Sequence, residues 1–189
     1  MNALEGQELL RAFQDLAGQY SEDHRFTAAD ICRMHKIWLG GIYPWAGQYR
    51  QVNISKGSFP FAAAAQIPRL MDEFEKNILR RHTPCRPRSR HDTAYDLAVV
   101  HTELILIHPF REGNGRVARL LASLMALQAG LPPLDFGHLK GKKREGYFAA
   151  VHAGMDRNYE PMVQVFSEAI TRTLRVSGQS ASSSGKEGR

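Results

Sequence analysis

Residues 94–129, AYDLAVVHTELILIHPFREGNGRVARLLASLMALQA, decide the fold of this chain. Apolar side chains run almost all round residues 94–108 and again round residues 117–129. A helix that is apolar on every side belongs in the middle of a bundle. We expect Asp92 or Thr93 to cap the first helix, and a glycine followed by two prolines to end the second. The sequence therefore predicts two buried helices joined by a polar connection.

Apolar residues at helical spacing predict further helices on both sides of this pair. The predicted ranges are 4–20, 28–39, 64–80, 144–153 and 161–175. Thr27 and Asp30 have the spacing of a capping box at the start of the second of these helices. Residues 42–61 have no helical period, and their alternating part predicts a hairpin that turns at Lys56 and Gly57. The predicted fold is all-α, a helical bundle with one small β-hairpin.

Length and composition indicate one domain with a substantial core. The chain has 189 residues, of which 43% are hydrophobic, and a domain of this size buries roughly two thirds of its unfolded surface. The sequence contains neither an apolar run of the ~18 residues that a membrane span needs nor the plan of a secretion signal. Cys32 and Cys85 do not form a disulfide framework. We therefore expect a cytoplasmic protein.

The basic charge is concentrated in one segment. The formal net charge is +6, and removing the five arginines of residues 80–91, RRHTPCRPRSRH, leaves +1. Prolines in that segment indicate a solvated loop. The alternative is an anionic partner such as nucleic acid, for which affinity would fall steeply with salt.

The connection between the two central helices has the composition of an anion site. Pro109 disfavours helical geometry at His108, so the imidazole should lie at the end of a buried helix. Gly113, Asn114 and Gly115 tolerate left-handed backbone, which allows successive N–H groups to converge on an anion at a helix N-terminus. A histidine beside such a site has the pKa range of a general base.

Charged residues strengthen this interpretation. Arg116 and Arg119 lie three apart on the first turn of the second helix, so we expect them to share a face. Cations there oppose the helix dipole, at a cost of about 0.3–1 kcal/mol each, which a bound polyanion would offset. Glu112 beside bound phosphates would suit Mg²⁺. Each of these residues alone also has a purely structural explanation; their concentration within twelve residues favours the site.

The stretch HPFREGNGRVAR, residues 108–119, resembles the motif of the Fic family, H-x-F-x-[D/E]-G-N-G-R-x-x-R, at every fixed position. Upstream, IYPWAGQYRQVNISKGSFPFA, residues 42–62, resembles the segment that forms the family's β-hairpin flap. The similarity runs over residues 26–174. The helical spacing before it and the composition after it complete a prediction of three regions: an N-terminal helical segment (1–25), a Fic domain (26–175) and a disordered Ser/Gly-rich tail (176–189).

The resemblance implies a protein adenylyltransferase, which transfers AMP from ATP to a Ser, Thr or Tyr hydroxyl of a target protein and releases pyrophosphate. It makes His108 the base, Phe110 a loop anchor and Glu112 the Mg²⁺ ligand. The residues implied to bind the nucleotide phosphates are Gly113, Asn114, Gly115, Arg116 and Arg119. The hairpin residues implied to clamp the target backbone are Ser55, Lys56 and Gly57.

The resemblance also bears on subclass and control. Relatives of the Doc type have a lysine in place of Gly115 and transfer a phosphoryl group, so this glycine favours nucleotidyl transfer. Many members carry an inhibitory motif, [S/T]-x-x-x-E-[G/N], whose glutamate pairs with the second motif arginine, here Arg119. Glu5 and Glu187 are both candidates; a separate inhibitory protein, as in toxin-like members, or no inhibitor are the other possibilities. Other nucleotide or phosphocholine donors, and a catalytically silent binding module, stay open.

Overall fold

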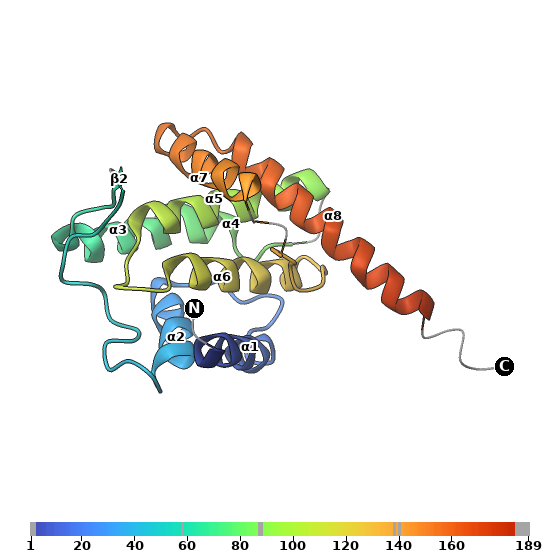
Figure 1. The fold of residues 1–189 in the computed structure, drawn as a ribbon, viewed down its shortest axis with the longest axis horizontal. Helices are drawn as coiled ribbons and strands as arrows, with labels where there is room; N and C mark the ends of the chain where they lie inside the picture. Colours follow the sequence, from blue (N-terminus) through green and yellow to red (C-terminus); the bar gives the residue numbers. More distant parts are fainter. Residues whose placement is uncertain (1–2, 58, 87–88, 138, 140, 184–189) are drawn as a thin grey trace.

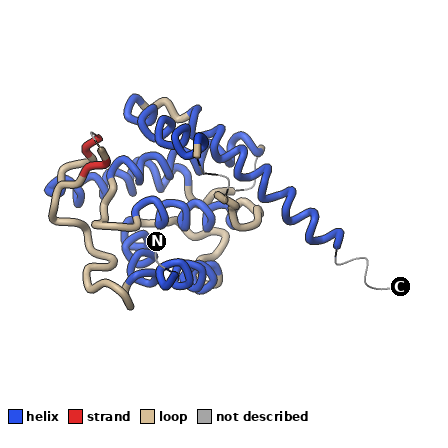
Figure 2. The backbone as a smooth tube through the Cα atoms, in the orientation of Figure 1, coloured by secondary structure: helices blue, strands red, loops and turns tan. Residues whose placement is uncertain are grey.

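The computed structural model describes residues 3–57, 59–86, 89–137, 139 and 141–183, and helices make up most of it (Figure 1). Figure 2 shows the one small pair of strands at an edge of the helical body. The helices, in chain order, are α1 (Ala3–Ala17), α2 (Ala28–Leu39), α3 (Ile67–Phe74), α4 (Arg80–His82), α5 (Arg90–Ile107), α6 (Asn114–Gln128), α7 (Lys142–Ala153) and α8 (Glu160–Ser183). The strands are β1 (Ser55–Lys56) and β2 (Phe59–Pro60), which pair antiparallel. The predicted all-α fold with a β-hairpin is confirmed.

Helices α5 and α6 form the centre of the structure, as predicted. Helix α5 packs against α8 on one side and against α6 on the other, and α6 packs against α1 and α2. In Figure 1, α7 and α8 therefore lie on one side of this central pair and α1 with α2 on the other. Buried residues follow both central helices along their whole length. Each fully buried aliphatic side chain contributes about 1.5–3 kcal/mol of transfer free energy.

Helix α2 begins and ends where the sequence predicts. The Thr27 hydroxyl accepts a hydrogen bond from the Asp30 backbone N–H at 3.1 Å, and the Asp30 carboxylate accepts from the Thr27 N–H at 2.9 Å. This capping box satisfies two donors that the first turn leaves open. It fixes the direction of α2, whose side chains His35 and Trp38 support the loop between α5 and α6.

The predicted cap of α5 is wrong. The helix begins at Arg90 after Ser89, whose hydroxyl accepts from the Asp92 backbone N–H at 3.1 Å. Asp92 and Thr93 are thus helical rather than capping residues. Serine is as good a cap as aspartate, so composition alone does not distinguish the two starts.

Two other helices differ from their expected ranges. The predicted helix over residues 64–80 is a series of a 3₁₀ turn η1 (Ala64–Gln66), α3, a π-helical segment η2 (Glu75–Leu79) and α4. Helix α8 continues to Ser183, past the expected end at residue 175. That extension contains no proline, and a helix once formed lengthens by one hydrogen bond per residue. The rest of the tail that we predict to be disordered, residues 184–189, lies outside the described residues.

The N-terminal segment packs into the same core as the rest of the fold. Ala12 and Leu16 of α1 are at most 1% exposed and belong to the core cluster. The basic loop is tied to this region, because the exposed Arg86 side chain pairs with Asp23 at 2.7 Å. Within the described part of the chain, no helix has the length and apolar character needed to cross a bilayer.

Candidate active site

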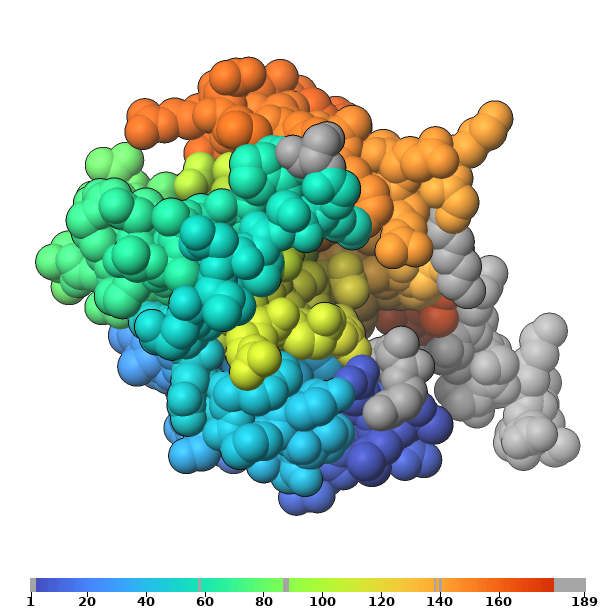
Figure 3. Space-filling model, turned by 60° about the vertical axis from the view of Figure 1, so that its left-hand side comes forward, coloured from blue at the N-terminus to red at the C-terminus, as the bar shows by residue number. Residues whose placement is uncertain are grey.

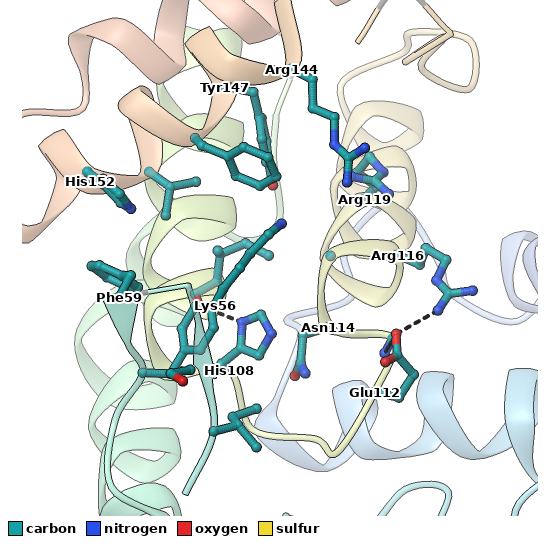
Figure 4. A pocket seen from close by; sticks show the side chains of 18 of the residues that line it. Lys56, Phe59, His108, Glu112, Asn114, Arg116, Arg119, Arg144, Tyr147 and His152 are labelled. Atoms are coloured by element: carbon teal, nitrogen blue, oxygen red, sulfur yellow. Dashed lines mark hydrogen bonds and ion pairs between the residues drawn. The ribbon is translucent and has the colours of Figure 1, made fainter. Parts of the chain in front are cut away.

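A cavity of about 880 Å³ opens where the hairpin, the α5–α6 loop and α7 meet. Figure 3 shows it as a hollow, with the teal hairpin on one side, orange α7 on the other and yellow residues of the α5–α6 connection at its floor. Nine of the ten predicted site residues line it, Gly57 being the exception. The nine are Ser55, Lys56, His108, Glu112, Gly113, Asn114, Gly115, Arg116 and Arg119. The structure therefore gathers the predicted motif and part of the predicted flap around one space (Figure 4).

His108 departs from helical geometry, as the following proline predicts, although not into the extended region that a proline favours. It ends α5 in the left-handed region, with φ 54° and ψ 59°. Its Nδ1 lies 3.0 Å from the Ile105 carbonyl oxygen, which can only accept, so Nδ1 carries the proton. Nε2 then keeps its lone pair. Burial, and secondarily the positive charges of Arg50 and Lys56, lower the pKa of His108 to about 4, so the imidazole is neutral at pH 7.

The loop that follows is shaped by buried contacts. Gly113 has φ +80°, and a Cβ there would lie 2.6 Å from the Trp38 ring. Asn114 accepts a hydrogen bond from the Phe110 N–H and donates to the Phe110 carbonyl, both at 2.8 Å. Left-handed backbone occurs at Gly113 but not at Asn114 or Gly115, which already belong to α6. Our expectation of left-handed backbone at Asn114 and Gly115 is wrong, as is the start of this helix near residue 117, because Gly113 makes the whole turn.

His35 was missed by sequence reasoning, although it supports the same loop. Its Nδ1 accepts from the Gly47 N–H at 2.9 Å, so Nε2 carries the proton and donates to the Glu112 carbonyl at 3.0 Å. The ring stacks on Phe110 with centroids 4.0 Å apart, and burial lowers its pKa. Its partner is 77 residues away, a separation at which periodicity carries no information.

The two motif arginines have different surroundings. Arg116 pairs with Glu112 at 2.9 Å and with Glu5 at 2.8 Å. Arg119 is half-buried and interacts with the Tyr147 hydroxyl, and this burial lowers its pKa. Both arginines line the same cavity, and Arg116 is held there by two carboxylates; their shared binding of one anion stays a prediction.

Glu5, one candidate for the inhibitory glutamate, lies close to the site. Its carboxylate is bonded to Arg116 and accepts from the Tyr43 hydroxyl at 3.0 Å, and these bonds lower its pKa. The Trp38 indole N–H donates to its carbonyl at 2.9 Å. The resemblance implies a pair with Arg119 instead, so that expectation is wrong for Glu5 in this structure. The second candidate, Glu187, lies outside the described residues.

Helix α7 supplies site residues that the sequence did not identify. Arg144 and Arg119 point toward one another in Figure 4. The Tyr147 hydroxyl lies 2.8 Å from Nε2 of His101, a buried histidine whose pKa is lowered to about 3 by burial. Arg144 and Tyr147 lie outside the motif and far from it in sequence, so only the fold brings them to the cavity.

The predicted hairpin residues lie at the mouth of the cavity. Ser55 and Lys56 form β1 and are exposed, and Gly57 turns with φ +59°. Lys56 Nζ lies 3.6 Å above the Phe148 ring, and Phe59 stacks on His152 of α7 with centroids 4.5 Å apart. The hairpin thus closes against α7 through a cation–π contact and a ring stack.

Comparison with known proteins agrees with this geometry. A model of the Fic/DOC family matches residues 25–126. Protein adenylyltransferase fic-1 of Caenorhabditis briggsae is 29% identical over 187 residues, which are 97% of this chain and 35% of that protein. Protein adenylyltransferase Fic of Nematostella vectensis is 28% identical over 149 residues, 78% of this chain and 33% of that protein. The chain thus spans about a third of the length of these curated relatives.

Solved structures share the fold. The BepC protein of Bartonella tribocorum, crystallised with AMPPNP, superposes with a TM-score of 0.68 at 22% identity, covering 87% of this chain and 83% of that chain. The N-terminal Fic domain of a cell filamentation protein of Bartonella quintana, with bound ADP, gives a TM-score of 0.67 at 26% identity, covering 87% and 82%.

Proposed function

This chain belongs to the Fic/DOC family, and we propose from that premise that it transfers AMP from ATP to a Ser, Thr or Tyr hydroxyl of a target protein, releasing pyrophosphate. The observation that carries the proposal is the neutral imidazole of His108 at a cavity that also holds the α6 N-terminus and Arg119. The similarity to two protein adenylyltransferases supports this reaction class.

His108 would act as the general base. Nδ1 is committed to the Ile105 carbonyl, so Nε2 is the nitrogen that takes the proton of the target hydroxyl. The hydroxyl oxygen then forms a bond to the α-phosphorus, and the bond from that phosphorus to the pyrophosphate oxygen breaks. A pKa near 4 keeps the base unprotonated at pH 7.

The phosphates would lie at the start of α6. The N–H groups of Asn114 and Gly115 are in the first turn, where no intrahelical acceptor precedes them. The helix dipole favours negative charge at this end. Arg119 would bind the far end of the triphosphate, and Arg116 would add charge once a phosphate competes with its present carboxylate partners. Gly113 would shape the turn.

Mg²⁺ fits the donor set at this position. The described residues hold no cluster of three or more His, Cys, Asp or Glu side chains that could bind a metal by themselves. Mg²⁺ commonly takes one or two carboxylates and completes its shell with phosphate oxygens and water. The Glu112 side chain is 61% exposed at the edge of the cavity and would be that carboxylate. When bound, the ion would neutralise phosphate charge.

The hairpin would hold the target protein. Ser55 and Lys56 line the cavity and, like Gly57 next to them, are exposed, so an extended target segment could pair with this short edge by strand addition. A toxin-like role, a separate inhibitory protein and a cytoplasmic site of action are further parts of the proposal. The proposed cytoplasmic site of action rests on ATP as the donor.

Labelling of cell lysate with α-labelled ATP and Mg²⁺ tests the proposal. Label should enter protein with the wild-type chain and not with His108→Ala. A parallel reaction with γ-labelled ATP distinguishes phosphoryl transfer, which would contradict nucleotidyl transfer. Competition by unlabelled UTP, GTP or CDP-choline identifies another donor if one is preferred. Equal labelling by wild type and His108→Ala would remove His108 from the mechanism.

A further inference from the structure

Arg50 is a buried cation with an unusual set of partners. It lies in the loop before β1 and is 1% exposed. Among the described residues, every hydrogen bond found for its guanidinium goes to a backbone carbonyl and none to a carboxylate. Burying a charge is costly unless its hydrogen bonds are satisfied. The protein therefore keeps this arginine for a geometric reason that an apolar residue could not serve.

The guanidinium joins three pieces of backbone. Nε donates to the carbonyl of His108 at 2.7 Å, which is the carbonyl of the base itself. Nη1 donates to the Val52 carbonyl at 2.7 Å, and Nη2 donates to the Ala62 carbonyl at 2.5 Å. Val52 precedes the hairpin and Ala62 follows it. One planar side chain thus connects both stems of the hairpin to the residue that ends α5.

We propose that Arg50 is a positioning residue that holds the hairpin in register with His108, so that a target segment on the hairpin presents its hydroxyl to the imidazole. The proposal rests on the function proposed above. A guanidinium presents its donors on three nitrogens in a rigid planar fork, whereas an ammonium carries three rotatable donors on a single nitrogen. Only the fork can fix Val52, Ala62 and His108 at once.

Two further contacts couple the hairpin to the imidazole. The Phe61 ring stacks on the His108 ring with centroids 3.7 Å apart. The Phe61 N–H donates to the Ile54 carbonyl at 3.2 Å, which closes the hairpin next to β1 and β2. If the stems of the hairpin move away from His108, this ring contact is lost, and the target hydroxyl no longer lies next to the imidazole.

The test compares Arg50→Lys with a matched control, Arg69→Lys, an exposed arginine of α3 that pairs with Glu73. Two quantities are measured: the initial rate of protein labelling at low lysate concentration with α-labelled ATP, and the melting shift produced by Mg·ATP. Arg50→Lys should lower labelling about 10–100-fold, the order expected for a misplacement of about 1 Å. Its Mg·ATP shift should match that of the wild type, because the α6 site is untouched.

Hydrogen exchange at the Phe61 amide gives a readout that does not depend on transfer. Exchange should be faster in Arg50→Lys and unchanged in Arg69→Lys. Unchanged labelling, unchanged exchange at Phe61, or an equal loss of labelling and ATP binding would overturn the proposal. If Arg50→Lys does not fold, Phe61→Leu decides: it should lower labelling and keep the Mg·ATP shift, and unchanged labelling would refute the coupling. If the wild-type chain labels no protein, the proposed function fails. Hydrogen exchange at the Phe61 amide still tests whether Arg50 holds the hairpin against His108.

Discussion

Asn114 provides a test that separates a loop-building role from a phosphate-binding role. The side chain is 2% exposed, and both of its amide atoms are bonded to Phe110. Asn114→Ala would leave the Phe110 N–H and carbonyl buried without partners. The loop that carries His108 and Glu112 should then lose its shape even when no nucleotide is present.

The size of the effect follows from these two hydrogen bonds. A buried polar group left without a partner costs about 1–3 kcal/mol, so two groups with some entry of water should cost about 3 kcal/mol. For a protein of this size, 1 kcal/mol corresponds to about 2–4 °C in melting temperature. Asn114→Ala should therefore melt about 6–12 °C below the wild type.

The assay is thermal unfolding with and without Mg·ATP. Asn77→Ala is the matched control, because Asn77 is an exposed asparagine and its loss should change stability by at most ~0.5 kcal/mol. Suppose instead that Asn114→Ala melts with the wild type in the absence of ATP and loses only the ATP-induced shift. Its side chain would then be a phosphate ligand, and the assignment to the loop would be refuted.

Other predictions concern charge. Glu5→Gln should enlarge the Mg·ATP melting shift, because it weakens the hold on Arg116; an unchanged or smaller shift would contradict this. Arg144→Gln should reduce the same shift without affecting the ATP-free protein, because it removes a cation facing the cavity; Arg144→Lys is the control, and no difference would exclude a role in binding. Stability in urea should fall as pH drops below about 6.5, by up to ~1.4 kcal/mol per unit for each buried histidine. In the unfolded chain these histidines bind protons below that pH, whereas in the folded chain the pKa of His101 is about 3 and that of His108 is about 4. His108→Asn should therefore make stability less dependent on pH. An unchanged pH dependence would contradict the contribution of His108.

Features governed by neighbouring residues were predictable from the sequence. The capping box of α2 involves Thr27 and Asp30, three positions apart. The departure of His108 from helical geometry agrees with the proline after it, and the two central helices follow from their apolar composition. In each case the residues that determine the local structure lie within one or two helical turns of it in sequence, so the pattern of residues along the chain is enough to predict it.

Contacts between distant segments were not predictable in the same way. Glu5 and Arg116 are 111 residues apart, yet they meet because α1 packs against α6. His101 and Tyr147 meet across the packing of α5 and α7. The charge and spacing of Arg116 predicted that it would need a negatively charged partner. They contained no information that a carboxylate of α1, Glu5, would be that partner.

The motif itself divides into residues that build the loop and residues that face the cavity. Phe110 is fully buried against His35, and Gly113 lies where any Cβ would meet Trp38. Packing dictates these two residues as strictly as the proposed reaction would dictate His108. Spacing alone cannot tell the two kinds of constraint apart, since each fixes the identity of a residue at a position. The difference is visible only in the folded chain, and it explains why the Asn114 side chain, in the middle of the motif, can serve the backbone rather than a ligand.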